Sequence, residues 1–147
     1  MAKETKSDFY QKMRTDIRDW LQTKTGKGYK WSEYLLLAPD LFHLLAKLAI
    51  DKDVPTAEKA KIAGALAYFI SPIDLVPEAM FGPMGYLDDV ALAAYVINSI
   101  MKNTGPEIII RHWAGEQDVL ELVQQIIDVA SEMLGTKVWD KLRKIVN

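Results

Sequence analysis

The chain has 147 residues, of which 50% are hydrophobic and 26% charged, and it contains no cysteine. This composition excludes a disordered chain, and the lack of cysteine excludes disulfides, thiolate metal sites and a cysteine nucleophile. A chain of this length can bury a core that needs no disulfide or metal to stabilise it. We therefore predict one helical domain over residues 1–147.

The net charge of −2 is unevenly distributed along the chain. Residues 1–30 carry eight Lys/Arg against four Asp/Glu, whereas residues 31–100 carry four against nine. A basic arm on an acidic body could meet an anionic surface. The basic residues are too mixed with acids for a nucleic-acid face, so no nucleic-acid partner is expected.

The longest uncharged runs, residues 62–73 and 90–101, have twelve residues each. Both are too short to cross a bilayer, which needs about 18 or more. The N-terminus shows no apolar segment or cleavage site typical of a signal peptide. We expect a cytoplasmic protein that could still associate with a membrane surface.

An amphipathic helix is predicted over residues 7–24, with Ser7 as its N-cap. Its apolar residues fall within an arc of about 120° when placed at 100° per residue. These residues are Phe9, Tyr10, Met13, Ile17, Trp20 and Leu21. The glycines at 26 and 28 end the helix.

The middle of the chain predicts two more helical regions. The first runs from Ser32 to Ile50, and Pro39 forces a break or a fresh start within it. Residues 51–55 form a polar connector, and a helix follows to Ile70. This helix is polar at its start and nearly all apolar from Ile62 onward.

A helix over residues 88–102 is apolar in every direction, which is typical of a buried helix. A short helix is predicted from 106 to 113, a long amphipathic one over 116–134, and a last one over 138–146. We therefore predict an all-α bundle of six to eight helices around a central apolar hairpin, residues 62–101. Helices 7–24 and 116–134 are expected to cover this hairpin.

Four carboxylates lie in the turn of this hairpin: Asp74, Glu78, Asp88 and Asp89. One interpretation is a divalent metal site, because Mg²⁺ and Ca²⁺ take oxygen ligands. The other is structural: Asp74 completes a capping box that begins at Ser71, and Asp88 and Asp89 occupy the favourable first turn of a helix. We prefer the structural interpretation, and we predict no other cofactor.

The same turn carries a family resemblance. The string SPIDLVPEAMFGPMGYLDDVALAAYVIN resembles the signature of the YkvA-like proteins, also called domain of unknown function 1232. The resemblance covers about residues 62–101 and leaves the flanking helices 7–24 and 116–146 uncovered. It implies a small helical domain of bacteria, often in membrane-associated proteins, with no agreed activity.

The two histidines are weak candidates for a site. Asp40 and His43 share a helix face, but a di-metal bundle would need paired Glu-x-x-His motifs, and the sequence has none. We predict that His43 is partly buried and hydrogen-bonded, and that His112 is a cation near a helix C-terminus. No nucleophile elbow, phosphate loop, dinucleotide fingerprint or HExxH motif occurs, so no catalytic residue is predicted.

Three functions remain open. A non-catalytic module that binds a protein partner or itself is favoured by an apparent surplus of apolar residues, including Trp20, Trp31 and Trp113. A membrane-peripheral protein is favoured by the basic first helix, which could lie on anionic lipid. A metal-dependent enzyme would use the acidic turn, residues 74–89. We rank the three in this order.

Overall fold

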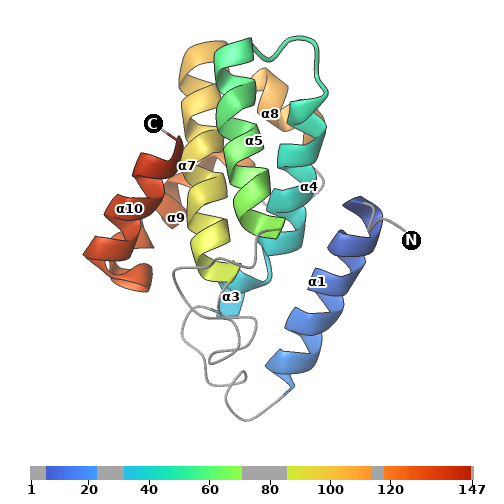
Figure 1. The fold of residues 1–147 in the computed structure, drawn as a ribbon, viewed down its shortest axis with the longest axis vertical. Coiled ribbons are helices and arrows are strands. Elements are labelled where there is room, and N and C mark those ends of the chain that lie inside the picture. Colours follow the sequence, from blue (N-terminus) through green and yellow to red (C-terminus); the bar gives the residue numbers. More distant parts are fainter. Residues whose placement is uncertain (1–5, 23–31, 71–85, 114–117, 147) are drawn as a thin grey trace.

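The computed structural model describes residues 6–22, 32–70, 86–113 and 118–146. This part of the chain contains eight helices and no strand, which confirms the predicted all-α bundle of six to eight helices (Figure 1). The helices are α1 (Lys6–Leu21), α3 (Ser32–Leu35), α4 (Ala38–Ala49), α5 (Thr56–Ile70), α7 (Tyr86–Thr104), α8 (Glu107–His112), α9 (Val119–Leu134) and α10 (Thr136–Val146).

Proline and glycine set several helix ends where the sequence predicts them. Pro39 lies in the first turn of α4, directly after the two-residue turn that separates α4 from α3. Gly135 ends α9 with a φ of 89°, a backbone conformation that residues with a Cβ rarely adopt.

The predicted capping box at residues 71–74 and the loop at 77–85 lie outside the described residues. The predicted Ser7 cap lies one residue inside α1, within the usual uncertainty of a helix end.

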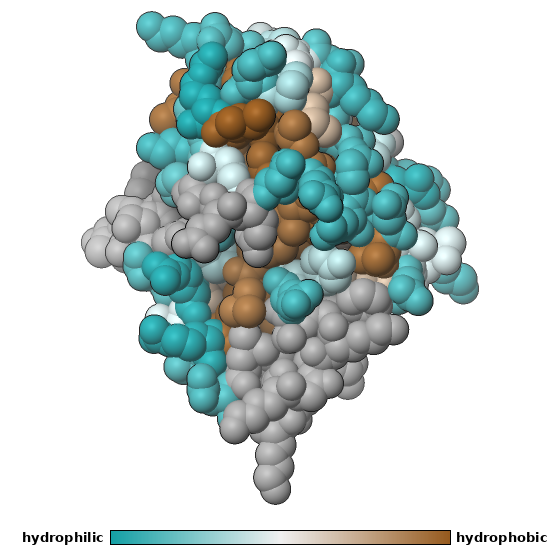
Figure 2. All heavy atoms as spheres, turned by 180° about the vertical axis from the view of Figure 1, so that it is seen from behind, coloured by the Kyte–Doolittle hydropathy of each residue, from teal (hydrophilic) through white to brown (hydrophobic). Residues whose placement is uncertain are grey.

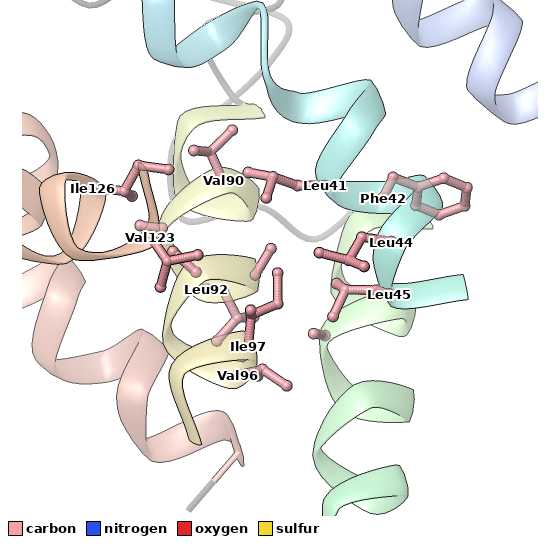
Figure 3. Close-up of a cluster of buried hydrophobic side chains, with 14 of the residues drawn as sticks. Leu41, Phe42, Leu44, Leu45, Val90, Leu92, Val96, Ile97, Val123 and Ile126 are labelled. Carbon is pink, nitrogen blue, oxygen red and sulfur yellow. The ribbon is translucent and has the colours of Figure 1, made fainter. Parts of the chain in front are cut away.

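Helix α7 is the centre of the bundle and packs against α4, α5, α9 and α10. Its residues 87–94 are all buried, as the all-round apolar pattern predicts. Figure 3 shows side chains of α4 meeting it from one side and those of α9 from the other. These include Leu41, Leu44 and Leu45 of α4, Val90, Leu92, Val96 and Ile97 of α7, and Val123 and Ile126 of α9.

The prediction that helix 7–24 covers the hairpin is wrong. Helix α1 packs mainly on α4, and α4 itself lies against α5 and α7 (Figure 1). The reason is the composition of α4, which buries eight of its twelve residues. Helix α5 is buried on one face only, since Ala60, Ala63 and Ala67 are exposed. Helix α9 covers α7 as expected.

Trp113 packs against the core and Trp139 of α10 packs within it, so they do not add to an exposed aromatic surplus. Trp113 is partly buried against the core rather than presented to solvent. Trp139 of α10 is buried and meets the Tyr95 ring edge-on, with centroids 5.9 Å apart. Trp31 lies outside the described residues. The large apolar side chains that are exposed in the described part are Leu36, Ile50 and Ile110.

Among the described helices, none is both long and apolar enough to span a bilayer. Hydrophobic residues nevertheless reach the surface in an interrupted band on the face shown in Figure 2.

Candidate functional site

Two of the four predicted turn carboxylates are described, and both are buried. Asp88 and Asp89 lie in the first turn of α7, with exposed fractions of 0% and 1%. The hydroxyl of Tyr68 on α5 donates a hydrogen bond to Oδ2 of Asp88 at 2.8 Å. Asp74 and Glu78 lie outside the described residues. The hairpin therefore carries two carboxylates inside the core, at the start of α7.

The position of these two acids at a helix N-terminus agrees with the structural interpretation. The positive end of the helix dipole favours a carboxylate there, and the Tyr68 hydroxyl offsets part of the cost of burying Asp88. Among the residues that the structure describes, no three Asp, Glu, His or Cys side chains are grouped closely enough to hold a metal ion. A site that also uses Asp74 and Glu78 stays a prediction.

A second polar cluster joins α5 to α7 around Glu58, which is only 4% exposed. Asn103 Nδ2 donates to Glu58 Oε1 at 2.6 Å, and Ser99 Oγ donates to Oε2 at 3.2 Å. Lys61 Nζ lies 3.6 Å from Glu58 Oε1 and donates to Ser99 Oγ at 2.8 Å. The buried Glu58 carboxylate thus has partners on both helices, and these contacts join α5 to α7.

The Lys61–Ser99 contact has the reach of a nucleophile with its base, but its surroundings oppose that chemistry. Lys61 Nζ also lies 3.6 Å from the Glu58 carboxylate in a salt bridge, so it is already engaged within the cluster. Ser99 lies in the middle of α7, where backbone N–H groups are used by the helix and cannot form an oxyanion hole. The cluster is therefore best explained as a structural contact.

A third cluster fastens the α4–α5 connector to α8. The side chain of Asp51 is 7% exposed; its Oδ2 lies 2.6 Å from His112 Nε2 and 3.1 Å from an Arg111 nitrogen. Arg111 also reaches Asp53 at 3.0 Å. The His112 hydrogen bond, followed by that of the Asp53 backbone N–H, lowers the pKa of Asp51. The hydrogen bond to Asp53 raises the pKa of Arg111 above its ordinary value.

The structure places the two histidines where the sequence predicts them. His112 lies in the last turn of α8, and its acidic partner Asp51 is 61 residues away in the chain. His43 is partly buried in α4, as is Asp40 one turn before it. The described residues group no third metal ligand with this pair.

Leu36 is one of three large apolar side chains that are exposed in the described part. It lies in the turn between α3 and α4, and 52% of it is exposed. A hollow of about 370 Å³ opens on one side of it, between this turn and the first turns of α9. The hollow has apolar lining from Tyr34, Leu36, Leu37 and Leu122, and polar lining from Glu33, Asp118, Glu121 and Gln125.

A second hollow of about 340 Å³ opens on the α1 side of the same leucine. It is lined by Arg14, Ile17, Arg18, Leu36, Pro39 and Asp40. Side-chain charges therefore sum to −3 around the first hollow and to +1 around the second. We call Leu36 with its two hollows the Leu36 surface, and the first hollow the acidic hollow.

Sequence reasoning missed the Glu58 cluster and the Leu36 surface. A signal for Glu58 exists: it precedes Ile62, Ala65 and Tyr68 at helical spacing, so it lies on the buried face of α5. No comparable signal exists for the Leu36 surface, because its residues come from α1, α3, α4, the turn between α3 and α4, and the start of α9.

Comparison with known families confirms the resemblance to domain 1232. Residues 58–95 match the family described as "Protein of unknown function (DUF1232)". The match begins four residues before the predicted segment and ends six residues before its end. It includes Glu58, Tyr68, Asp88 and Asp89, which are buried polar groups of the hairpin. The relation to YkvA-like proteins in particular stays a prediction.

The chain is also similar to curated proteins. It is 29% identical over 99 residues to "Uncharacterized protein ORF9" of Methanothermobacter thermautotrophicus, covering 67% of this chain and 68% of that protein. It is 41% identical over 56 residues to the E3 ubiquitin-protein ligase RNF170 of Danio rerio, covering 37% of this chain. It is 57% identical over 28 residues to RNF170 of Xenopus laevis, covering 19% of this chain. The matches span 20% and 11% of those two ligases. No solved structure matches the chain.

Proposed function

Taking residues 58–95 as a segment of the DUF1232 family, we propose that this protein is a non-catalytic interaction module that docks an amphipathic helix of a partner protein on the Leu36 surface. The family description and the name of the archaeal relative state no activity. The proposal therefore rests on the geometry of this surface.

The observation that carries the proposal is the exposure of Leu36 on a ridge between two hollows. An amphipathic helix binds a groove through its apolar side chains at i, i+3, i+4 and i+7. An exposed apolar residue between two hollows with apolar floors offers contacts for such side chains. Leu37 and Leu122, which line the acidic hollow, are 7% exposed and belong to the core, so the floor is fixed. A partner would cover Leu36 and fill both hollows without disturbing the bundle.

The other polar clusters support a role without catalysis. Glu58, Lys61, Ser99 and Asn103 bond to one another, and their bonds join α5 to α7. The similarity to the ubiquitin ligases is confined to a small part of those proteins. A similarity of this extent is expected if the matched segment is a helical unit that also occurs as a small part of larger proteins.

Two synthetic helical peptides of 14 residues test the proposal. They share one spacing of leucines, and their polar positions are all lysine in one and all glutamate in the other. We expect at least one peptide to shift the backbone amide signals of Leu36, Leu37 and Leu122 in ¹⁵N-labelled protein. Leu36→Gln should weaken that binding at least about fivefold, the typical minimum effect of an anchor residue.

Ile110→Gln is the matched control, because Ile110 is 56% exposed but lines neither hollow. It should leave binding unchanged. The proposal is wrong if neither peptide shifts these signals, or if the two variants weaken binding equally.

A membrane-peripheral function is the second candidate, and one observation favours it. Lys137, Lys141 and Lys144 are exposed and follow one another at i, i+4 and i+7, so they form a single row on α10. The row lies opposite the buried Trp139 and Leu142. Such a row could meet anionic lipid without exposing the core.

Sedimentation with vesicles of 30% phosphatidylserine in phosphatidylcholine tests this candidate. Each basic side chain near an anionic surface contributes roughly 1 kcal/mol, so Lys→Gln at all three α10 positions should reduce binding strongly. The same change at Lys12, Arg14 and Arg18 of α1 tests the face predicted from the sequence. Absence of binding at low salt would eliminate this function for the chain.

A further inference from the structure

We infer that the acidic hollow selects the charge of the partner: it takes lysine or arginine side chains from the edge of the docked helix. This inference rests on the proposed function, because it assigns the partner's chemistry at the same surface. It requires that the partner be cationic where it faces α9.

The acidic hollow carries an excess of negative charge. Glu33, Asp118 and Glu121 surround the acidic hollow, and no Lys or Arg among the residues that the structure describes lines it. Glu33 and Glu121 are exposed, so their charges face the space that a partner would occupy. An anionic edge placed there would be repelled, whereas a cationic edge would be attracted.

The carboxylates of the acidic hollow are too dispersed for a single metal ion. The described residues contain no group of three carboxylates close enough to hold one metal ion, so these acids are spread around the hollow. Part of Asp118 is also committed, because its Oδ1 accepts from the backbone N–H groups of Leu120 and Glu121. A dispersed set of carboxylates does not match a compact inorganic ion.

The floor of the acidic hollow is apolar. Tyr34, Leu37 and Leu122 line the hollow together with the acids. Lysine and arginine carry long apolar stems that pack on such a floor while the charged group stays at the rim. The combination of apolar floor and acidic rim therefore fits basic side chains of a peptide better than a small ion.

The second hollow sets the orientation of the docked helix. It holds Arg14 and Arg18 with Asp40, and its side-chain charge is +1. A helix that lies across Leu36 with its basic edge toward α9 avoids placing this edge against α1. The arrangement thus favours one of the two ways in which the helix can face the surface.

The test uses the two Leu/Lys and Leu/Glu peptides with the full chain. At low salt we expect the Leu/Lys peptide to bind the Leu36 surface at least about tenfold more tightly than the Leu/Glu peptide, since several rim charges act together. Glu121→Gln should weaken the Leu/Lys peptide about two- to fivefold, the range of one exposed ion pair. The preference should decline in 0.3 M salt, where exposed charges are screened.

Glu132→Gln is the matched control. Glu132 is exposed on the same helix, lies three turns beyond Glu121 and does not line the hollow. Its replacement should leave the affinity unchanged. Equal effects of Glu121→Gln and Glu132→Gln would mean that the peptide senses only net charge, and the inference would be overturned.

The two proposals fail differently. If both peptides bind equally and Leu36→Gln weakens both, the docking surface stands and the charge selection is wrong. If neither peptide binds at Leu36, both proposals are wrong. If millimolar Mg²⁺ or Ca²⁺ displaces the Leu/Lys peptide while matched ionic strength of NaCl does not, the hollow is an ion site and the inference is wrong.

Discussion

The hydroxyl of Tyr68 and the carboxylate of Asp88 form a buried hydrogen bond of 2.8 Å across the hairpin of α5 and α7. The two residues are 20 positions apart, and both are almost fully excluded from solvent. A polar bond between two helices of an apolar core restricts how they can slide, because any shift leaves a buried carboxylate with fewer partners.

We expect Tyr68→Phe to destabilise the protein by about 1.5–3 kcal/mol, the range for a hydrogen bond to a charged group. Urea unfolding of the wild type and variant measures this difference. In an Asp88→Asn background the same change should cost less, since the acceptor is then neutral. Equal costs in the two backgrounds would show that Tyr68 contributes through packing alone.

Glu58, within the residues 58–95 that match the family, should also contribute to stability. Glu58→Ala removes the acceptor of Asn103 and Ser99 and the acidic partner of Lys61, which keeps only its hydrogen bond to Ser99. We expect a loss of about 1–3 kcal/mol in the free energy of unfolding, at about 0.5–1.5 kcal/mol for each of the two lost hydrogen bonds. Glu132→Ala on the exposed face of α9 should change it by less than about 0.5 kcal/mol. A similar small effect at both positions would contradict the structural role of the Glu58 cluster.

The part of the fold and of the candidate site that could be predicted from the sequence depends on how far apart the interacting residues lie along the chain. Pro39 and Gly135 act on the backbone at their own positions, so helix ends near them were predictable. The Glu58–Asn103 contact joins residues 45 apart, and helical periodicity carries no information about which residue of another helix faces Glu58. The packing of α4 between α1 and the hairpin could not be predicted for the same reason, because the apolar face of a helix does not show which other helix will cover it.

The acids of the hairpin illustrate the same limit. Their position in the first turn of α7 follows from the local pattern of residues 86–92, but their burial does not. An acid at a helix start is usually exposed, and burial depends on α5, which supplies Tyr68. Sequence reasoning therefore identified Asp88 and Asp89 as notable residues and could not predict their environment.

The pH dependence of stability should report on Asp51. Its folded-state pKa is lowered by His112 and the Asp53 backbone N–H, so it contributes stability above the ordinary Asp pKa of about 3.9. This contribution is lost as the pH falls below about 4 through the lowered folded-state pKa. Unfolding between pH 2 and 7 should show a smaller loss in acid for Asp51→Asn than for wild type. Asp128→Asn on the exposed face of α9 is the control, and identical acid dependence of all three proteins would contradict the account.

The alternative metal site in the acidic turn has its own test. A cation at 100 times its dissociation constant would add about 2.7 kcal/mol to the wild type, and both Asp74→Ala and Asp74→Asn should abolish this gain. The capping interpretation predicts no gain from Mg²⁺, Ca²⁺ or Mn²⁺ relative to chelator. It predicts a loss of about 0.5–2 kcal/mol for Asp74→Ala and a smaller loss for Asp74→Asn. Unfolding midpoints of the three proteins decide between them.

The central claim is that a basic helix docks on the Leu36 surface, and paramagnetic broadening locates it without changing the protein. A spin label at one end of the Leu/Lys peptide should broaden the amide signals of Tyr34, Leu36 and Leu122 most strongly, while those of Lys141 on α10 stay sharp. Broadening centred on Asp128 and Glu132, the acids of α9 that lie outside the acidic hollow, would contradict the claim.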